Sequence, residues 1–328
     1  MVFLKNMTKN HKCPVCASYS RKSLLSLYDD RYGYNGVFSL QQCEHCNHMH
    51  LDGAPSERAL GDLYTNFYPR KSFNPNNFKP YKKGNFVQNW LVGGKSSACQ
   101  SVAEGSIVLD IGCGYGETLS YMESKGCDVY GVDADRNVEV VAEKYGFKIH
   151  VGVFDASIYE PDFFDYVTMN QVIEHVPDLD QTLSMISTVL KPGGYCVMST
   201  PNANGWGAKA FGRKWINWHA PYHQQFLSKE SLTLLAKKSG FQVESIKTVT
   251  RSEWVVYQVL HLLSYPEAGV ASSFWAPYEQ KRSFSKKVLQ KLIVASKFLL
   301  LPQLITRFFD VLRIGDNYLI VLKKKHNE

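Results

Sequence analysis

The sequence has no long apolar run and no dense set of cysteines. Its longest apolar stretches, Phe298–Pro302 and Tyr318–Leu322, fall well short of the roughly 18 residues that cross a bilayer. Residues Met1–Asn6 contain no apolar core and no small-residue cleavage site, so we expect no signal peptide. Eight cysteines in 328 residues are too few for a disulfide scaffold and suit a reducing compartment. We therefore expect a cytoplasmic protein.

Acidic residues outnumber basic ones only in the middle of the chain. The composition, 45% hydrophobic and 20% charged, is that of a globular protein and excludes disordered and fibrous classes. The net charge is +7, and residues 1–100 carry 13 basic and 6 acidic side chains. Residues 101–250 carry 12 and 18, and residues 251–328 carry 12 and 6. Two basic flanks around an acidic centre indicate that the flanks and the centre have different roles.

Short apolar runs alternate with helical periodicity from residue 106 onward, which predicts a doubly wound α/β sheet. The predicted strands are 107–111, 128–133, 147–151, 164–170, 195–200, 241–249 and 317–322. The predicted helices are 117–125, 136–145, 179–190 and 228–239, the last with Ser228 as N-cap, and 191–194 is a predicted turn. We divide the chain into a Cys-rich segment (1–55), a connector (56–104), the core (105–250), a helical insertion (251–314), and a final strand with its tail (315–328).

A glycine-rich loop, Asp110-Ile111-Gly112-Cys113-Gly114-Tyr115-Gly116, follows the first predicted strand of the core and opens a helix. Glycines let the backbone pass close to a ligand, and a helix N-terminus presents unpaired N–H groups. Asp133 ends the next strand, 23 residues after Asp110, where a carboxylate can accept both hydroxyls of a ribose. The loop, its context and the second aspartate together predict a nucleotide-type ligand.

The Asp-x-Gly-x-Gly-x-Gly spacing resembles the first motif of class I S-adenosylmethionine (SAM) methyltransferases, and Gly131–Asp133 resembles their second. Asn170–Val176 and Leu190–Gly194 are similar to later segments of that family. The resemblance covers roughly 105–250 and implies a Rossmann-like, seven-stranded sheet with an antiparallel last strand. It implies that Asp133 holds the ribose and Asp155 the adenine amino group. The full set of SAM-binding residues that it implies is Asp110, Gly112, Gly114, Gly116, Asp133, Ala134, Phe154, Asp155, Asn170 and Gln171.

Two Cys-x-x-Cys turns in the N-terminal segment predict a zinc ribbon. Cys13 and Cys16 are separated from Cys43 and Cys46 by 26 residues, and four thiolates complete a tetrahedral zinc site. Such a closed site is structural rather than catalytic. His45, His48 and His50 are spare ligands that we expect on the surface instead.

A zinc ribbon joined to this methyltransferase core resembles two kinds of enzyme. Some ribosomal RNA methyltransferases combine the two, and a basic flank suits phosphates. However, Tyr28–Tyr34 and Leu60–Arg70 resemble zinc-ribbon methyltransferases of bacterial polysaccharide and deoxysugar pathways. The saccharide hypothesis implies a small-molecule, nucleotide-linked or lipid-linked saccharide acceptor. A third hypothesis, an adaptor with vestigial SAM binding, conflicts with the intact glycine loop.

Two clusters are candidates for the catalytic base. Glu174 and His175 follow a core strand and resemble metal ligands of ubiquinone-pathway O-methyltransferases, or else they only hold their loop. Tyr222 and His223 lie among aromatic residues that suit a sugar ring. They match a Tyr-His-Glu-His run of sugar C-methyltransferases, whereas Gln224 and Gln225 depart from it. We therefore favour O-methylation of a hydroxyl, with His223 as the general base.

The segment 252–314 combines apolar helical stretches with lysines. Lys286–Leu301 reads as an apolar helix with Lys on part of its circumference. It is predicted to pack as a lid or a homodimer interface, or to lie on the inner face of the membrane. The sequence leaves these alternatives open.

Overall fold

The computed structural model describes residues 12–53, 55, 96–276, 284–295 and 300–326, together with a few isolated residues. Those isolated residues are Leu63, Phe67, Phe78, Asn85, Val87, Asn89 and Trp90. The predicted connector, 56–104, and the Leu60–Arg70 resemblance therefore lie largely outside the described residues.

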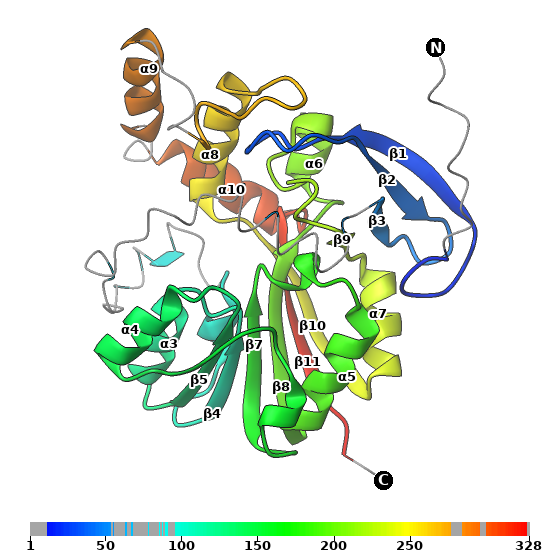
Figure 1. The fold of residues 1–328 in the computed structure, drawn as a ribbon, viewed down its shortest axis with the longest axis vertical. Coiled ribbons are helices and arrows are strands. Elements are labelled where there is room, and N and C mark those ends of the chain that lie inside the picture. Colours follow the sequence, from blue (N-terminus) through cyan, green and yellow to red (C-terminus); the bar gives the residue numbers. More distant parts are fainter. Residues whose placement is uncertain are drawn as a thin grey trace.

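A seven-stranded sheet forms the centre of the described structure, in the order β10-β11-β8-β7-β4-β5-β6 (Figure 1). Strand β11 is antiparallel to both of its neighbours, and the other pairs are parallel. This confirms the predicted Rossmann-like sheet with an antiparallel last strand. The strands are β4 (Ile107–Ile111), β5 (Asp128–Asp133), β6 (Lys148–Val151), β7 (Phe164–Asn170), β8 (Leu190–Pro201), β10 (Phe241–Val249) and β11 (Asn317–Lys324).

Helices cover both faces of the sheet, because successive strand residues point to opposite sides. Leu109 of β4 packs in one core with α5 (Leu179–Val189) and α7 (Lys229–Lys238). Val108 packs in the opposite core with α3 (Glu117–Glu123) and α4 (Val138–Tyr145). The short 3-10 helix η3 (Ala98–Ser101) lies on this second side.

Local sequence signals account for the helix starts. Ser228 caps α7 as predicted, since its Oγ accepts a hydrogen bond of 2.9 Å from the N–H of Ser231. Asp178 caps α5 in the same way. The predicted turn at 191–194 is wrong, because β8 already begins at Leu190 and runs through it, with an irregular register against β7.

A second, four-stranded antiparallel sheet lies above the carboxyl end of the central sheet (Figure 1). Its strands are β1 (Arg21–Leu27), β2 (Phe38–Cys43), β3 (Met49–Asp52) and β9 (Gln225–Phe226). Strand β9 comes from the C-terminal part of the core segment and pairs with β3. The Cys-rich segment is therefore joined to the core by backbone hydrogen bonds as well as by side-chain packing.

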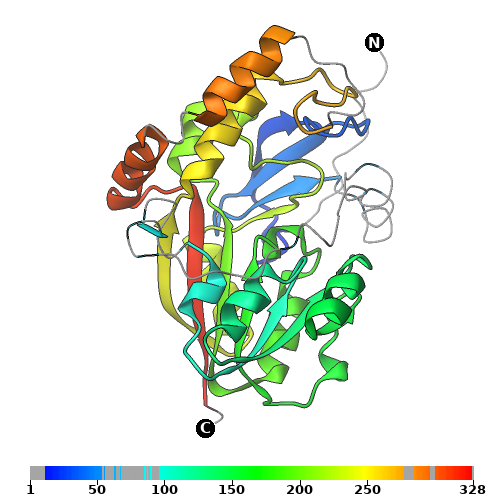
Figure 2. The ribbon, with the colours of Figure 1, turned by 90° about the vertical axis from the view of Figure 1, so that its left-hand side faces the viewer.

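The helical insertion comprises α8 (Ser252–Leu263), α9 (Phe284–Ala295) and α10 (Leu301–Val311). Figure 2 shows α9 beside α8, and α10 also packs against α8, where the hydroxyls of Thr306 and Ser252 are 2.9 Å apart. The remaining helix, α6 (Trp206–Phe211), packs near the ribbon sheet. Within the described ranges, no helix is long and apolar enough to span a membrane.

Candidate functional site

The loop after β4 has the backbone geometry that only glycine tolerates well. Gly112, Gly114 and Gly116 have φ values of 72°, 54° and 88°. A Cβ at Gly112 would lie 2.4 Å from Cγ2 of Val172, and one at Gly116 would lie 3.0 Å from the ring of Phe147. A Cβ at Gly114 would meet nothing within 4 Å. The loop is therefore packed on two sides and open at Gly114, where a ligand can approach.

Two aspartates, one in β4 and one at the end of β5, hold the glycine loop and the start of the helix that follows it through hydrogen bonds. Asp110 is buried, and its carboxylate accepts hydrogen bonds from the hydroxyls of Thr118 and Thr168, the latter at 2.6 Å. Burial raises the pKa of Asp110 to about 6. Asp133, at the end of β5, accepts hydrogen bonds of 2.9 Å from the N–H groups of Gly114 and Asp135. Its carboxylate thus lies directly beside the open glycine, and Ala134 is exposed next to it.

The predicted adenine-binding loop follows β6. Phe154 is buried in the main core, whereas Asp155 is exposed and caps the 3-10 helix η4 (Ala156–Ile158). Hydrogen bonding with Ser157 lowers the pKa of Asp155, so the side chain is a carboxylate at neutral pH. The exposed Val153 offers an apolar surface in the same loop.

Asn170 and Gln171 lie at the end of β7 and line a cavity of about 90 Å³. The cavity continues along Ser96, Ser97, Arg251 and Trp254. The side-chain oxygen Oδ1 of Asn170 accepts hydrogen bonds from Ser97 Oγ, Ala98 N and Ser199 Oγ at 2.8–3.1 Å. Its amide Nδ2 is buried and has no hydrogen-bond partner among the described residues. An unpaired buried donor is costly, and a ligand in this cavity would satisfy it.

Glu174, His175 and His223 converge on one point at the carboxyl end of the sheet. Their ligand atoms all lie within 4.8 Å of one another, and Nε2 of His223 is 4.0 Å from Oε1 of Glu174. Glu174 Oε2 accepts a 3.0 Å hydrogen bond from Thr200, while Oε1 has no hydrogen-bond partner in the described part of the chain. Burial raises the pKa of Glu174 to about 8 and lowers the pKa of His223 well below its usual value.

Both histidines are oriented through Nδ1. His175 Nδ1 donates to the carbonyl of Tyr222 at 2.9 Å, and His223 Nδ1 donates to the carbonyl of Asn217 at 2.7 Å. In the neutral rings Nε2 is then the unprotonated nitrogen. This arrangement suits a proton acceptor and equally suits a metal ligand.

Tyr222 lies behind His223, on the side of the ribbon. It is fully buried and stacks on His219 with a centroid distance of 4.8 Å, and Tyr32 meets its ring edge-on at 5.6 Å. Tyr32 belongs to the ribbon loop Tyr28–Tyr34, whose position beside Glu174, His175 and His223 is not predicted by the sequence. The tyrosines and charged residues that are concentrated in Tyr28–Tyr34 are the sequence feature that could have indicated a role for this loop near the site.

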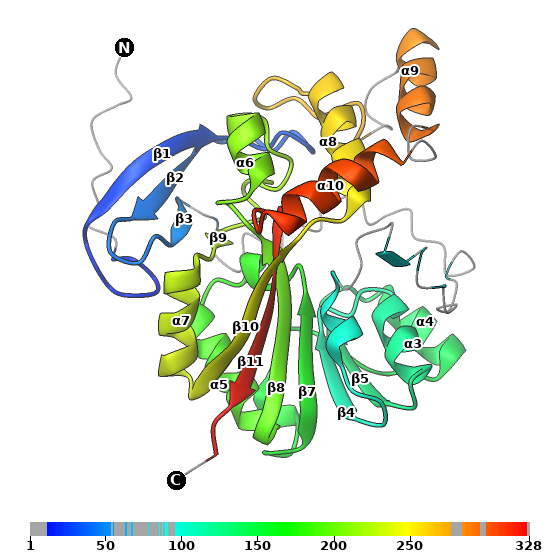
Figure 3. The ribbon, with the colours of Figure 1, turned by 180° about the vertical axis from the view of Figure 1, so that it is seen from behind.

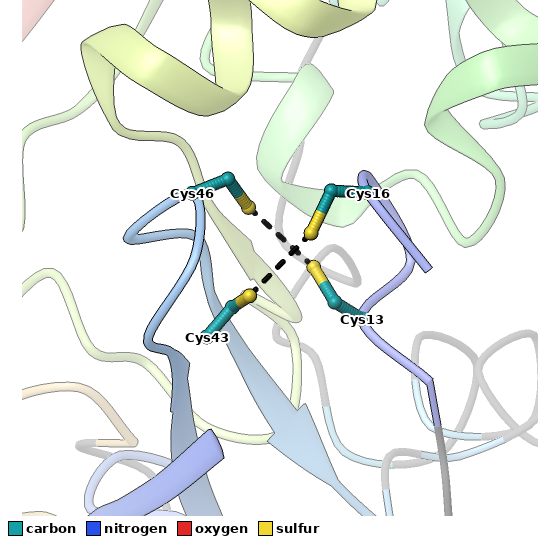
Figure 4. A group of neighbouring side chains, drawn as sticks. All are labelled: Cys13, Cys16, Cys43 and Cys46. Carbon is teal, nitrogen blue, oxygen red and sulfur yellow. Dashed lines mark hydrogen bonds between the residues drawn. The ribbon is translucent and has the colours of Figure 1, made fainter. Parts of the chain in front are cut away.

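The four cysteines of the ribbon meet as predicted (Figure 4). The Sγ atoms of Cys13 and Cys46 are 3.6 Å apart, and those of Cys16 and Cys43 are 3.5 Å apart. Zn–S bonds of about 2.3 Å in a tetrahedron place sulfurs roughly 3.8 Å apart, so the cluster fits a zinc ion. The contact between these two thiols lowers the pKa of Cys13 and raises that of Cys46, so the pair favours one shared thiolate even without a metal ion.

The predicted surface position is wrong for His48 and His50, and only His45 is exposed. His48 Nε2 donates to Oε1 of Gln225 at 2.8 Å, and the β3–β9 pairing covers both rings. Burial lowers the pKa of His48 to about 4. Gln225, one of the two residues that depart from the C-methyltransferase run, thus serves to hold the ribbon.

Comparisons with known proteins agree with this geometry. A family described as "Methyltransferase domain" matches residues 95–246. A ubiquinone biosynthesis O-methyltransferase of Chromobacterium violaceum is 30% identical over 158 residues, which are 43% of this chain and 67% of the relative. The enzyme of the same name from Burkholderia thailandensis is 29% identical over 195 residues, 55% of this chain and 82% of the relative.

A solved structure shares the fold. Phosphoethanolamine N-methyltransferase 2 of Haemonchus contortus, in complex with phosphomonomethylethanolamine and S-adenosylhomocysteine, aligns with a TM-score of 0.51 at 19% identity. The alignment covers 93% of this chain and 71% of that one. At this level of identity the similarity concerns the fold alone.

Proposed function

The chain belongs to the class I SAM-dependent methyltransferases, and we propose that it methylates a hydroxyl oxygen of a saccharide acceptor. The observation that carries the proposal is the buried Glu174–His175–His223 cluster at the carboxyl end of the sheet. Relatives that are named O-methyltransferases support oxygen as the methylated atom. The saccharide part rests on the ribbon resemblance and on the polar cavity beside Trp254.

The residues at the glycine loop fit SAM, which supplies an electrophilic methyl group on a sulfonium. Gly114 leaves room for it, and in the proposal Asp133 and Ala134 would hold the ribose while Phe154 and Asp155 would hold the adenine. Asn170 and Gln171 would border the methionine part. Asp110, with both oxygens held by threonines, would act by positioning the loop.

In the proposed mechanism, His223 accepts the proton of the acceptor hydroxyl at Nε2. Ionisation of Glu174 places a negative charge 4.0 Å from that nitrogen and stabilises the imidazolium. Because the pKa of Glu174 is about 8, we expect the rate to rise with pH through that range. His175 keeps the neighbouring backbone in place through Tyr222.

The test replaces His223 by Ala. We expect methyl transfer to fall at least about 100-fold, the usual range for losing a general base, with an unchanged dissociation constant for SAM. The matched control is His45→Ala, on the exposed side of the ribbon, which should leave both unchanged. Full activity of the His223 variant would refute its role as a base.

The same three side chains form a donor set for a divalent metal, and this is the second candidate mechanism. Both imidazoles are held at Nδ1 by carbonyls, which is the usual outer support of metal-ligating histidines. The general-base mechanism depends mainly on His223, whereas the metal mechanism depends on Glu174 and His175 as well, because all three would be ligands. Metal-dependent activity that His175→Ala abolishes would favour the metal mechanism.

RNA and enolate-type C-methyl acceptors are the alternative substrates. In the ribbon, Arg21 pairs with Asp52 at 3.5 Å, so one of its two adjacent basic residues is already engaged. Transfer of labelled methyl from SAM into fractionated cell extract would decide among saccharide, lipid, RNA and protein. Label in RNA, with transfer that falls steeply as the salt concentration rises, would favour an RNA methyltransferase that binds RNA through the ribbon. The proposed partners otherwise are a small-molecule, nucleotide-linked or lipid-linked saccharide and structural Zn²⁺.

A further inference from the structure

Helix α10 has its polarity reversed relative to an ordinary surface helix. Leu301, Leu304, Phe308 and Val311 are 58%, 60%, 60% and 80% exposed. They recur at intervals of three and four residues, so they form one stripe along the helix. Figure 3 shows α10 crossing the outside of the molecule over the strands behind it.

The polar residues of α10 face the protein instead. Thr306 is fully buried and its hydroxyl is 2.9 Å from that of Ser252 in α8. Arg307 pairs with Asp310 at 2.7 Å and donates to the carbonyl of Thr250. The inward face is thus fastened by hydrogen bonds, which holds the apolar stripe outward.

Helix α9 also exposes large apolar side chains. Val288, Leu289, Leu292 and Val294 are 41–63% exposed, and Figures 1 and 2 show the helix standing out beside α8. Leu300 and Leu312 flank α10 and are 44% and 52% exposed. A soluble surface rarely exposes so many large apolar side chains together, unless they bind something. We call the exposed apolar residues of α9 and α10 the docking face.

Charge decides between a bilayer and a second copy of the chain as the occupant. Among the described side chains of residues 284–313, Lys291 and Arg313 are exposed, whereas the acidic Asp310 is paired with Arg307. Two copies of a face that carries these exposed cations would repel each other, whereas anionic headgroups would attract it. Aliphatic side chains flanked by lysines are also the composition of helices that lie in the bilayer interface.

We propose that α9 and α10 dock the enzyme on a bilayer that contains anionic lipid. The face would insert Leu304, Phe308 and their neighbours at the level of the headgroups. This inference concerns where the enzyme works, and it does not depend on the identity of the methyl acceptor.

The experiment is co-sedimentation of the full chain with vesicles of phosphatidylcholine containing about one third phosphatidylglycerol. We expect wild-type protein to pellet, and the partition coefficient of the Leu304→Glu/Phe308→Glu variant to fall at least about tenfold. Both side chains are exposed, so the variant should keep its circular dichroism spectrum and its SAM affinity. Val140→Glu, at a 49% exposed site on α4, is the matched control and should pellet like wild type.

Three results would overturn the proposal. The first is wild-type protein that does not bind anionic vesicles, and the second is a double variant that binds them as well as wild type. The third is a dimer in sedimentation equilibrium that the double variant loses, which would assign the face to a second copy. If wild-type protein binds the vesicles but transfers no methyl group to a saccharide, that result counts against the proposed function and not against the docking proposal.

Discussion

The three glycines of the loop after β4 are required for different reasons. Gly112 and Gly116 have packed neighbours that would collide with a Cβ, whereas Gly114 combines a positive φ with open space. The carboxylate of Asp133 beside this open space is held by two N–H groups, as the proposed ribose site would require. Steric demand at the first and third positions and ligand access at the second explain why the loop needs all three.

The variant Gly114→Ala should separate ligand access from backbone strain. Its control is Gly105→Ala, which has φ +73° and also has nothing within 4 Å of the added Cβ. Both should lose roughly 1–2 kcal/mol of stability, because alanine is strained at positive φ. Isothermal titration should show weaker SAM binding only for Gly114→Ala. Equal affinity in the two variants would place the cofactor elsewhere.

Glu174 links folding stability to pH. Its pKa is about 8 in the folded protein and 4.5 as an unperturbed side chain. Between these pH values the folded state holds a proton that the unfolded state has lost, so stability falls as the pH rises. Glu174→Gln removes this term. In urea unfolding at pH 5.5 and 8.5, its stability relative to wild type should therefore be greater at pH 8.5. A difference that does not change with pH would contradict the raised pKa.

At the scale of elements, regular periodicity was readable from the sequence, but pairing between distant segments was not. Strands β4, β5, β7 and β10 were predicted to the residue, because each is bounded on at least one side by a glycine, an asparagine or a charged residue. The two-residue strand β9 has no periodicity, and only its contact with β3 makes it a strand. For the same reason His48 was predicted as exposed, since its partner Gln225 lies 177 residues away.

The β3–β9 pairing makes the proposed zinc site a support for His223. Ser228, two residues after β9, donates to the carbonyl of Cys46 at 2.7 Å. Cys16→Ser should lower the zinc content, loosen β9 and reduce methyl transfer. The affinity for SAM should stay the same, because the residues proposed to bind SAM lie on strands β4 to β7 and in the loops that follow them. Metal analysis and titration would check this, with Cys127→Ser as the control for a cysteine outside the ribbon. Unchanged transfer by zinc-free protein would show that the ribbon does not support the site.

At the scale of the whole molecule, the predicted segments do not stand apart. Asp30 of the ribbon lies 3.4 Å from Nε2 of His261 in α8. Arg31 donates to the carbonyl of Ile216 and stacks over Trp275 at 4.3 Å. Ribbon, core loop and insertion thus share one buried interface, in which Trp215, Trp218 and Phe226 meet Leu40 and Trp254. The uneven charge of the sequence distinguished the three segments but could not show that they share this interface.

A shared interface implies cooperative unfolding. Calorimetry of the full chain should show one transition. Arg31→Ala should lower its midpoint temperature and reduce the free energy of unfolding by about 2–3 kcal/mol, because a buried charged hydrogen bond and a cation–π contact are lost together. Far-ultraviolet and near-ultraviolet circular dichroism should shift in parallel. Lys22→Ala, on the exposed strand β1, is the control and should leave the transition in place. Two resolved transitions, or a shift in only one probe, would mean that the ribbon folds as a separate domain and does not support the catalytic cluster through this interface.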